Sequence, residues 1–179
     1  MNTKNNKRRQ ASVERIKRAF MEILEHTPLS RIKVADICQS AGINRSTFYA
    51  NYLDVYDLAD KMYLELQHEV EGMFVLKHSV DQYKSDFLEL FRHIQAYRER
   101  YLFIFKLGYE NRRITLPDTF DFEDAMDDQM KEYHIEFFRN GFNSIVKLWL
   151  ENGCRETPEQ MCEMLLCEYR GRFEKNKIK

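Results

Sequence analysis

The chain has 179 residues, of which 44% are hydrophobic and 32% charged, a balance typical of globular rather than disordered proteins. No N-terminal apolar stretch and no run of about 18 uninterrupted apolar residues is present, so we expect a cytoplasmic protein without signal peptide or membrane span. Residues 1–53 carry ten Lys or Arg against four acidic residues, whereas the remainder carries 18 against 25; this asymmetry indicates a polyanionic partner for the first third, or a merely solvated basic tail.

Three helices are predicted within residues 1–53. The first spans 11–26, where apolar residues recur at helical spacing, and Pro28 prevents its continuation. The second spans about 34–40 and is followed by Gly42, which favours a tight turn with positive φ. Asn44 is a good N-cap for a third short helix that runs from residue 45 to about 51.

The remainder of the chain is also predicted to be helical, because only six Gly and three Pro interrupt it. A long helix over 54–76 would span about 33 Å at 1.5 Å per residue, and Ser79 with Gln82 would open the next one. Residues 101–105 fit a strand or a buried helix by periodicity, and the helical surroundings favour the helix. After a loop over 108–118, we expect helices over 120–151, with a possible break near Gly141, and over 158–173.

Two short helices joined by a glycine-containing turn are the helix-turn-helix pattern, within the segment 33–52. The major groove of B-DNA admits one α-helix, while the first helix of the pair crosses the DNA backbone. The second helix offers polar groups for phosphates or base edges, whereas Phe48 and Ala50 are suited to packing. The polar residues are Arg45, Ser46, Thr47, Tyr49 and Asn51.

Residues 10–60 resemble the DNA-binding domain of the TetR family of bacterial regulators. The resemblance rests on Ala41-Gly42, on Asn44, on the run 47–52 (Thr-Phe-Tyr-Ala-Asn-Tyr) and on Asp57-Leu58. Towards the C-terminus, residues 137–142, 149–153 and 157–159 are similar to the C-terminal domain of a TetR subgroup found in Gram-positive bacteria. The resemblance implies an all-α fold with a three-helix DNA-binding domain at 1–53 and a larger ligand-binding or partner-binding and dimerisation domain at 54–179.

The resemblance also implies roles for single residues. Thr47 and Tyr49 would contact phosphates, while Arg45 and Ser46 would lie nearest base edges, and Arg45 could bind a guanine with two hydrogen bonds. Two positions depart from the family pattern: Lys33 replaces the usual Thr or Ser cap, and Val55 replaces a common phosphate-binding Lys. The candidate DNA-binding residues are Lys7, Arg8, Arg9, Lys33, Asn44, Arg45, Ser46, Thr47, Tyr49 and Asn51.

The resulting hypothesis is a homodimeric, sequence-specific transcriptional regulator, a repressor that binds a near-palindromic operator in double-stranded DNA. A small-molecule effector or a protein partner would change the separation of the two DNA-binding domains. An effector pocket would be lined by aromatic residues, although aromatics at this spacing are more often core: Tyr97, Tyr101, Phe105 and Phe120. The alternative functions are a transcriptional activator or a helical adaptor that works through a protein partner.

No enzymatic activity, cofactor or metal is expected. The sequence contains no P-loop, GxGxxG, HExxH or GxSxG motif, although their absence does not disprove a small-molecule enzyme on a helical scaffold. The four cysteines have no CxxC spacing, and neither they nor the histidines show the spacing of metal ligands.

Overall fold

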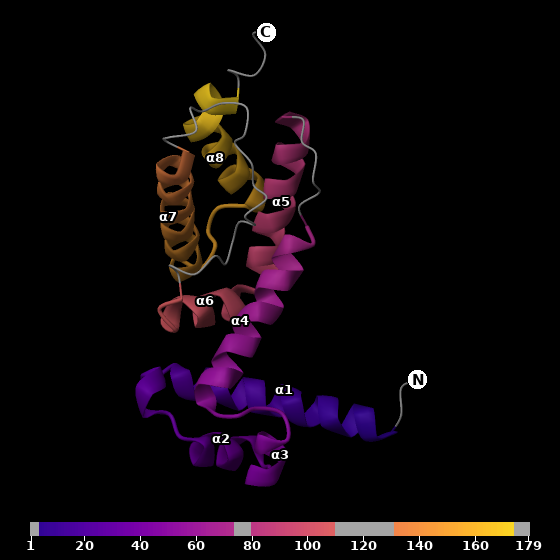
Figure 1. Cartoon of the computed structure of the whole chain (residues 1–179). Helices are drawn as coiled ribbons and strands as arrows, with labels where there is room; N and C mark the ends of the chain where they lie inside the picture. Colours follow the sequence, from indigo (N-terminus) through magenta and orange to yellow (C-terminus); the bar gives the residue numbers. More distant parts are fainter. Residues whose placement is uncertain (1–3, 74–79, 110–130, 174–179) are drawn as a thin grey trace. The chain divides into compact units, whose positions relative to one another are not determined.

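The computed structural model describes residues 4–73, 80–109 and 131–173, and all regular structure within these ranges is helical (Figure 1). The prediction of an all-α fold is therefore confirmed. The elements are α1 (Lys4–Leu24), the short 3₁₀ helix η1 (Leu29–Arg31), α2 (Val34–Ala41), α3 (Arg45–Tyr49), α4 (Val55–Glu71), α5 (Val80–Ala96), α6 (Arg98–Lys106), α7 (Lys131–Glu151) and α8 (Pro158–Phe173). None of these helices is long and apolar enough to cross a membrane.

The chain packs as two units, residues Met1–Glu65 and Leu66–Lys179. The boundary lies within α4, so the first part of this helix packs with α1–α3 and its last residues belong to the second unit. Packing thus assigns residues 54–65 to the first unit, whereas the functional domains predicted from the sequence divide after residue 53. That functional division stays a prediction.

The core of the first unit consists of the apolar stripes that give its helices their periodicity. Phe20 of α1, Ile37 of α2, Phe48 of α3 and Leu58 of α4 are completely buried. Burial of each such side chain contributes about 1.5–3 kcal/mol. Because α3 has only five residues, too few for a stable isolated helix, Phe48 is what fixes it against its neighbours.

The helix ends differ in places from those predicted. α1 begins at Lys4 rather than near residue 11, and α4 ends at Glu71 rather than near residue 76. Gly72 follows α4 directly, and its N–H still donates to the carbonyl of His68 at 3.2 Å. The start of α4 is as expected, since the side chain of Asp54 accepts a hydrogen bond of 2.8 Å from the N–H of Asp57.

The second unit has an aromatic core. Phe91 of α5 contacts both Phe142 and Trp149 of α7, each with 5.6 Å between ring centroids. Residues 101–105 are helical, as predicted, and lie in α6 with three of their aromatic side chains buried. α7 continues through Gly141 without the break considered from the sequence.

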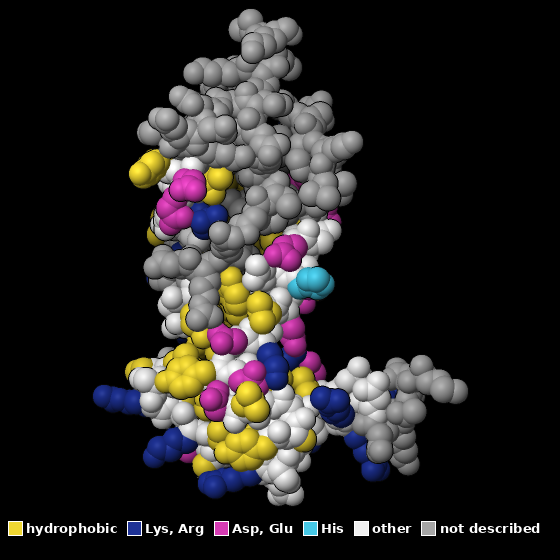
Figure 2. Space-filling model, in the orientation of Figure 1, with side chains coloured by type: hydrophobic (Ala, Val, Ile, Leu, Met, Phe, Trp, Pro, Cys, Tyr) yellow, Lys and Arg dark blue, Asp and Glu magenta, His cyan; other side chains and the backbone are white. Residues whose placement is uncertain are grey.

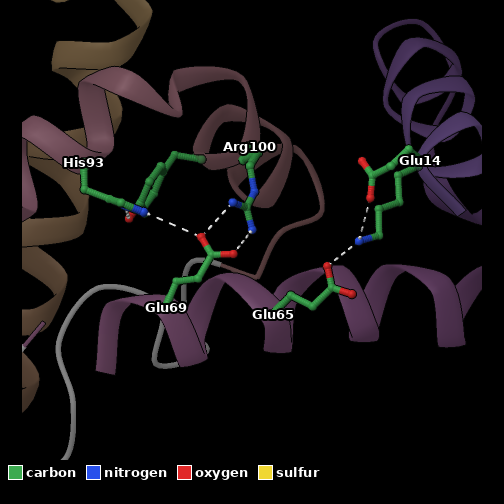
Figure 3. A network of polar contacts seen from close by, with 7 residues as sticks. Glu14, Glu65, Glu69, His93 and Arg100 are labelled. Carbon is green, nitrogen blue, oxygen red and sulfur yellow. Dashed lines mark hydrogen bonds and ion pairs between the residues drawn. The ribbon is translucent and has the colours of Figure 1, made fainter. Parts of the chain in front are cut away.

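A polar network in the second unit joins α4, α5 and α6 (Figure 3). The carboxylate of Glu69 accepts two hydrogen bonds from the guanidinium of Arg100, at 2.7 and 3.0 Å, and lies 3.6 Å from Nε2 of His93. The other ring nitrogen of His93 is hydrogen-bonded to the hydroxyl of Tyr101 at 2.8 Å. Arg100 holds the pKa of Glu69 below its ordinary value, while burial lowers the pKa of His93. The network therefore favours an ionised Glu69 beside a neutral imidazole.

Candidate nucleic-acid interface

The turn between α2 and α3 sets the direction in which α3 leaves α2. Gly42 has φ 62° and ψ 45°, the left-handed conformation that the sequence predicts for this glycine. The N–H of Ile43 donates to the carbonyl of Cys38 at 3.0 Å, which satisfies the end of α2. Asn44 then has extended backbone angles and stands at the N-cap of α3, although its side chain makes no capping hydrogen bond.

The short helix α3 has one buried face and one exposed face. Phe48 points into the core, where its ring contacts those of Tyr49 and Tyr52 at centroid distances of 5.6 Å. Arg45 and Ser46 are exposed on the outer face, and Thr47 is half-buried. Tyr49 is 56% exposed, and its ring stands at 87° to that of Phe48.

A groove of about 330 Å³ runs between α1 and α3. Arg9 of α1 reaches the segment that follows α3, because its Nε donates to Oδ1 of Asn51 at 2.8 Å. Asn51 in turn donates through Nδ2 to the carbonyl of Thr47, also at 2.8 Å. The lining residues are Arg8, Arg9, Ser12, Ser46, Thr47, Ala50 and Asn51.

A second groove of about 420 Å³ lies beside the α2–α3 turn. Here Arg15 contacts the carbonyl of Gly42 and the hydroxyl of Ser12, each at 3.4 Å. This groove is lined by Ser12, Arg15, Cys38, Gln39, Gly42, Ile43, Asn44 and Thr47. Ser12 and Thr47 line both grooves, which therefore form one continuous surface over α1, α2 and α3.

Sequence reasoning missed Ser12, Arg15 and Gln39 as part of this surface. The first two follow Arg8 at steps of four and three residues, so Arg8, Ser12 and Arg15 share one face of α1. That spacing is a signal that the sequence contains. Lys7 and Lys33, both predicted to bind DNA, are exposed but line neither groove.

The surface is basic. None of the residues that line the two grooves is acidic, and three of them are arginines: Arg8, Arg9 and Arg15. Figure 2 shows Lys and Arg side chains at several places around the edge of the first unit. Burial raises the pKa of the Cys38 thiol and the charge of Arg45 partly opposes this, so Cys38 is a neutral lining group. The chemistry of the surface is that of a polyanion-binding site.

The aromatic residues predicted to line an effector pocket are differently placed. Tyr101 is completely buried and Phe105 nearly so, whereas Tyr97 is 47% exposed at the start of α6. Tyr97 packs its ring against His93, with 4.6 Å between centroids, and Nζ of Lys147 lies 6.0 Å from the ring centre of Phe105. Phe120 lies outside the described residues. Within the described part of the chain, no three His, Cys, Asp or Glu residues are grouped so that they could hold a metal ion.

The chain is similar to known proteins both in its sequence and in its fold. Residues 81–166 match the family model TetR_C_8, described as transcriptional regulator C-terminal region. The solved structure of a protein named dihydroxyacetone kinase operon activator DhaS is similar with a TM-score of 0.55 and 15% sequence identity, over 91% of this chain and 96% of that one. No curated protein matches the sequence. The family match includes residues 137–142, 149–153 and 157–159, so it confirms the resemblance to a TetR regulator in the C-terminal part of the chain.

Proposed function

We propose that this chain, which matches a transcriptional regulator C-terminal region over residues 81–166, is a regulator of the TetR family and binds duplex DNA sequence-specifically through α3. The observation that carries the proposal is the exposed polar face of α3. The buried Phe48 holds this helix in the core, and the two grooves beside it have no acidic lining residues. A helix held in this way fits the major groove, while the basic grooves beside it suit the phosphate backbone.

The exposed residues of α3 divide between the two tasks. Arg45, at the first position of α3, is the candidate for hydrogen bonds to O6 and N7 of a guanine, with Ser46 beside it. Tyr49 and Thr47 would donate to phosphates, which fix the register of the helix without reading sequence. Lys33 and Lys7 supply further positive charge at exposed positions of the same unit, and Asn44 lines the groove beside the turn.

A homodimer is the proposed binding form, and α7 supports it. Phe138 and Phe142 of α7 are buried in the core of the second unit, whereas Tyr133, Phe137 and Leu148 of the same helix are 70%, 66% and 59% exposed. A helix with apolar residues on a second, exposed face is suited to pairing with a copy of itself. Two such copies would present two α3 helices to successive major grooves about 34 Å apart, hence a near-palindromic operator.

We further propose that the protein is a repressor whose DNA affinity responds to an effector or protein partner of the second unit. Activation is the competing outcome, and the structurally similar DhaS is itself named an operon activator. A reporter gene behind the selected operator separates the two. Deletion of the regulator raises expression if it represses and lowers expression if it activates.

The experiment that tests DNA binding starts with selection of bound duplexes from random DNA by the full-length chain. The selected duplex is then titrated with wild type, Arg45→Ala, Arg45→Lys and Tyr49→Phe by fluorescence anisotropy. Arg155→Ala is the matched control, because Arg155 is an exposed arginine of the second unit. Tyr49→Phe removes only the hydroxyl and keeps the ring contact with Phe48.

Arg45→Ala is expected to weaken binding of the selected duplex by roughly 5- to 150-fold for each DNA-binding unit, the equivalent of about 1–3 kcal/mol, and to relax selection at one base pair of each half-site. Arg45→Lys keeps the charge but loses the two-pronged hydrogen bond, so it should relax the same base pair. Failure of the wild type to enrich any duplex, or an Arg45→Ala affinity equal to that of Arg155→Ala, would refute the proposal.

A further inference from the structure

The side chain of Asn51 is engaged within the protein rather than presented to solvent. Its Oδ1 accepts the hydrogen bond from Nε of Arg9, and its Nδ2 donates to the carbonyl of Thr47. Its backbone carbonyl accepts a further hydrogen bond of 3.1 Å from Nζ of Lys61 in α4. Asn51 is half-buried and follows the last turn of α3, so it ties the end of this helix to α1 and α4.

The contact with Asn51 orients the guanidinium of Arg9. Arginine presents five N–H donors in a planar fork, and a hydrogen bond at Nε fixes the plane while the two terminal nitrogens are left for a ligand. Arg9 is otherwise an exposed side chain with several rotatable bonds, and its ordering on binding costs conformational entropy. Asn51 removes part of that cost before any ligand arrives.

The composition of the α1–α3 groove defines the ligand that it suits. Arg8 and Arg9 supply positive charge, and Ser12, Ser46 and Thr47 supply hydroxyl groups, while the remaining two lining residues are Ala50 and Asn51. Guanidinium and hydroxyl donors without a competing carboxylate are complementary to a phosphodiester. The groove adjoins the exposed face of α3, so a phosphate of the same duplex would reach it when α3 lies in the major groove.

We propose that Asn51 is a positioning residue, which holds Arg9 so that the α1–α3 groove binds a phosphate of the DNA backbone. The inference rests on the proposed DNA binding and assigns different roles in it to different residues. Asn51 acts on affinity through Arg9, whereas Arg45 acts on sequence choice.

A double-mutant cycle tests the proposal with the full-length chain and the selected duplex. Affinities of wild type, Arg9→Ala, Asn51→Ala and the double variant are measured by anisotropy between about 0.1 and 1 M salt, and repeated with a scrambled duplex. Asn51→Ser is measured as a second, polar substitution in case Asn51→Ala folds poorly. Circular dichroism and the melting temperature of each variant report any loss of structure.

Loss of the phosphate contact in Arg9→Ala should reduce the salt slope by about one for each DNA-binding unit. For the proposed dimer, the loss of affinity should therefore be about 60-fold larger at 0.1 M than at 1 M salt, or about eightfold for each unit. Asn51→Ala should lose affinity in the same salt-dependent way on both duplexes. In the Arg9→Ala background, Asn51→Ala should change affinity by less than about twofold, because the arginine that Asn51 positions is absent.

Two results would overturn the assignment while DNA binding itself stands. One is an equal loss from Asn51→Ala in both backgrounds, which would indicate a purely structural role. The other is an Asn51→Ala variant with wild-type affinity and salt slope. In both cases the wild type still binds the selected duplex and Arg45→Ala still weakens it. A wild-type chain that binds no duplex overturns the proposed function and this inference together.

Discussion

Replacement of Gly42 by alanine isolates the backbone cost of the helix-turn-helix turn. Gly42 has φ 62°, and a Cβ added to it would meet no atom within 4 Å, so the penalty comes from the left-handed backbone and not from a clash. A left-handed alanine costs about 1–2 kcal/mol. Alanine also lowers the entropy of the unfolded chain, which offsets about 0.4–1 kcal/mol. The net expectation is a loss of stability of roughly 1 kcal/mol.

Gly72→Ala is the matched control for this substitution. Gly72 does not have positive φ, and its added Cβ would lie in ordinary contact, 3.5 Å from the carbonyl oxygen of Glu69. Only the unfolded-state term then applies, so this variant should gain about 0.4–1 kcal/mol. Gly42→Asn should lose less than Gly42→Ala, because asparagine tolerates the left-handed region better.

Urea unfolding followed by circular dichroism measures these differences, with the slope against urea compared between variants. The difference between Gly42→Ala and Gly72→Ala should be about 1–2 kcal/mol, the left-handed strain alone. Equal free energies of unfolding for the two variants, or a Gly42→Ala chain as stable as wild type, would show that the turn does not impose this backbone strain.

Three further predictions concern the second unit. Burial lowers the pKa of His93 below its ordinary 6.5, so the neutral form in the folded state contributes stability that is lost as the pH falls below about 6.5. In His93→Gln, the free energy of unfolding measured with urea should therefore depend less on pH between about pH 7 and 5. A pH dependence equal to that of the wild type would contradict this. The side chains of Thr157 and Gln160 cap α8 reciprocally, at 2.8 and 3.3 Å, so Thr157→Ala should cost about 0.5–2 kcal/mol in urea unfolding, and no loss would argue against the capping box. Phe137→Glu should convert the proposed dimer to monomer in sedimentation velocity while Arg155→Ala stays dimeric, and a Phe137→Glu dimer would exclude this face of α7.

The helices were predictable from the sequence wherever an apolar stripe coincided with an end signal. Asp54 and Thr157 form side-chain caps at the starts of α4 and α8, and Gly42 adopts the predicted left-handed turn. The first seven residues of α1, from Lys4 to Gln10, contain no apolar side chain, so hydrophobic periodicity gives no sign of this extension. For α4 the error is the opposite one: apolar residues at helical spacing continue past Glu71 in the sequence, but the helix ends there, before Gly72.

In the candidate site, too, features within one short segment were predictable, whereas contacts between residues far apart in the sequence were not. Arg45 and Tyr49 were identified from a pattern that lies within one short helix, and both are exposed. The hydrogen bond between Arg9 and Asn51 joins positions 42 residues apart, and that between Arg15 and Gly42 joins positions 27 apart. No local rule relates such pairs, because they depend on how α1 packs across α2 and α3. The sequence alone therefore predicted basic residues in α1 but not which of them meet α3.

Different residues of α3 serve the stability of the fold and the proposed recognition of DNA. Phe48 is completely buried, and large-to-small changes at such positions cost about 3–5 kcal/mol. Arg45 and Ser46 on the opposite face are exposed, so replacing them removes little packing. Besides Phe48, the helix is held by the Gly42 turn before it and by Asn51 after it. Under the proposed function, base-contacting residues on this face can therefore change the preferred DNA sequence while the fold that positions them is retained.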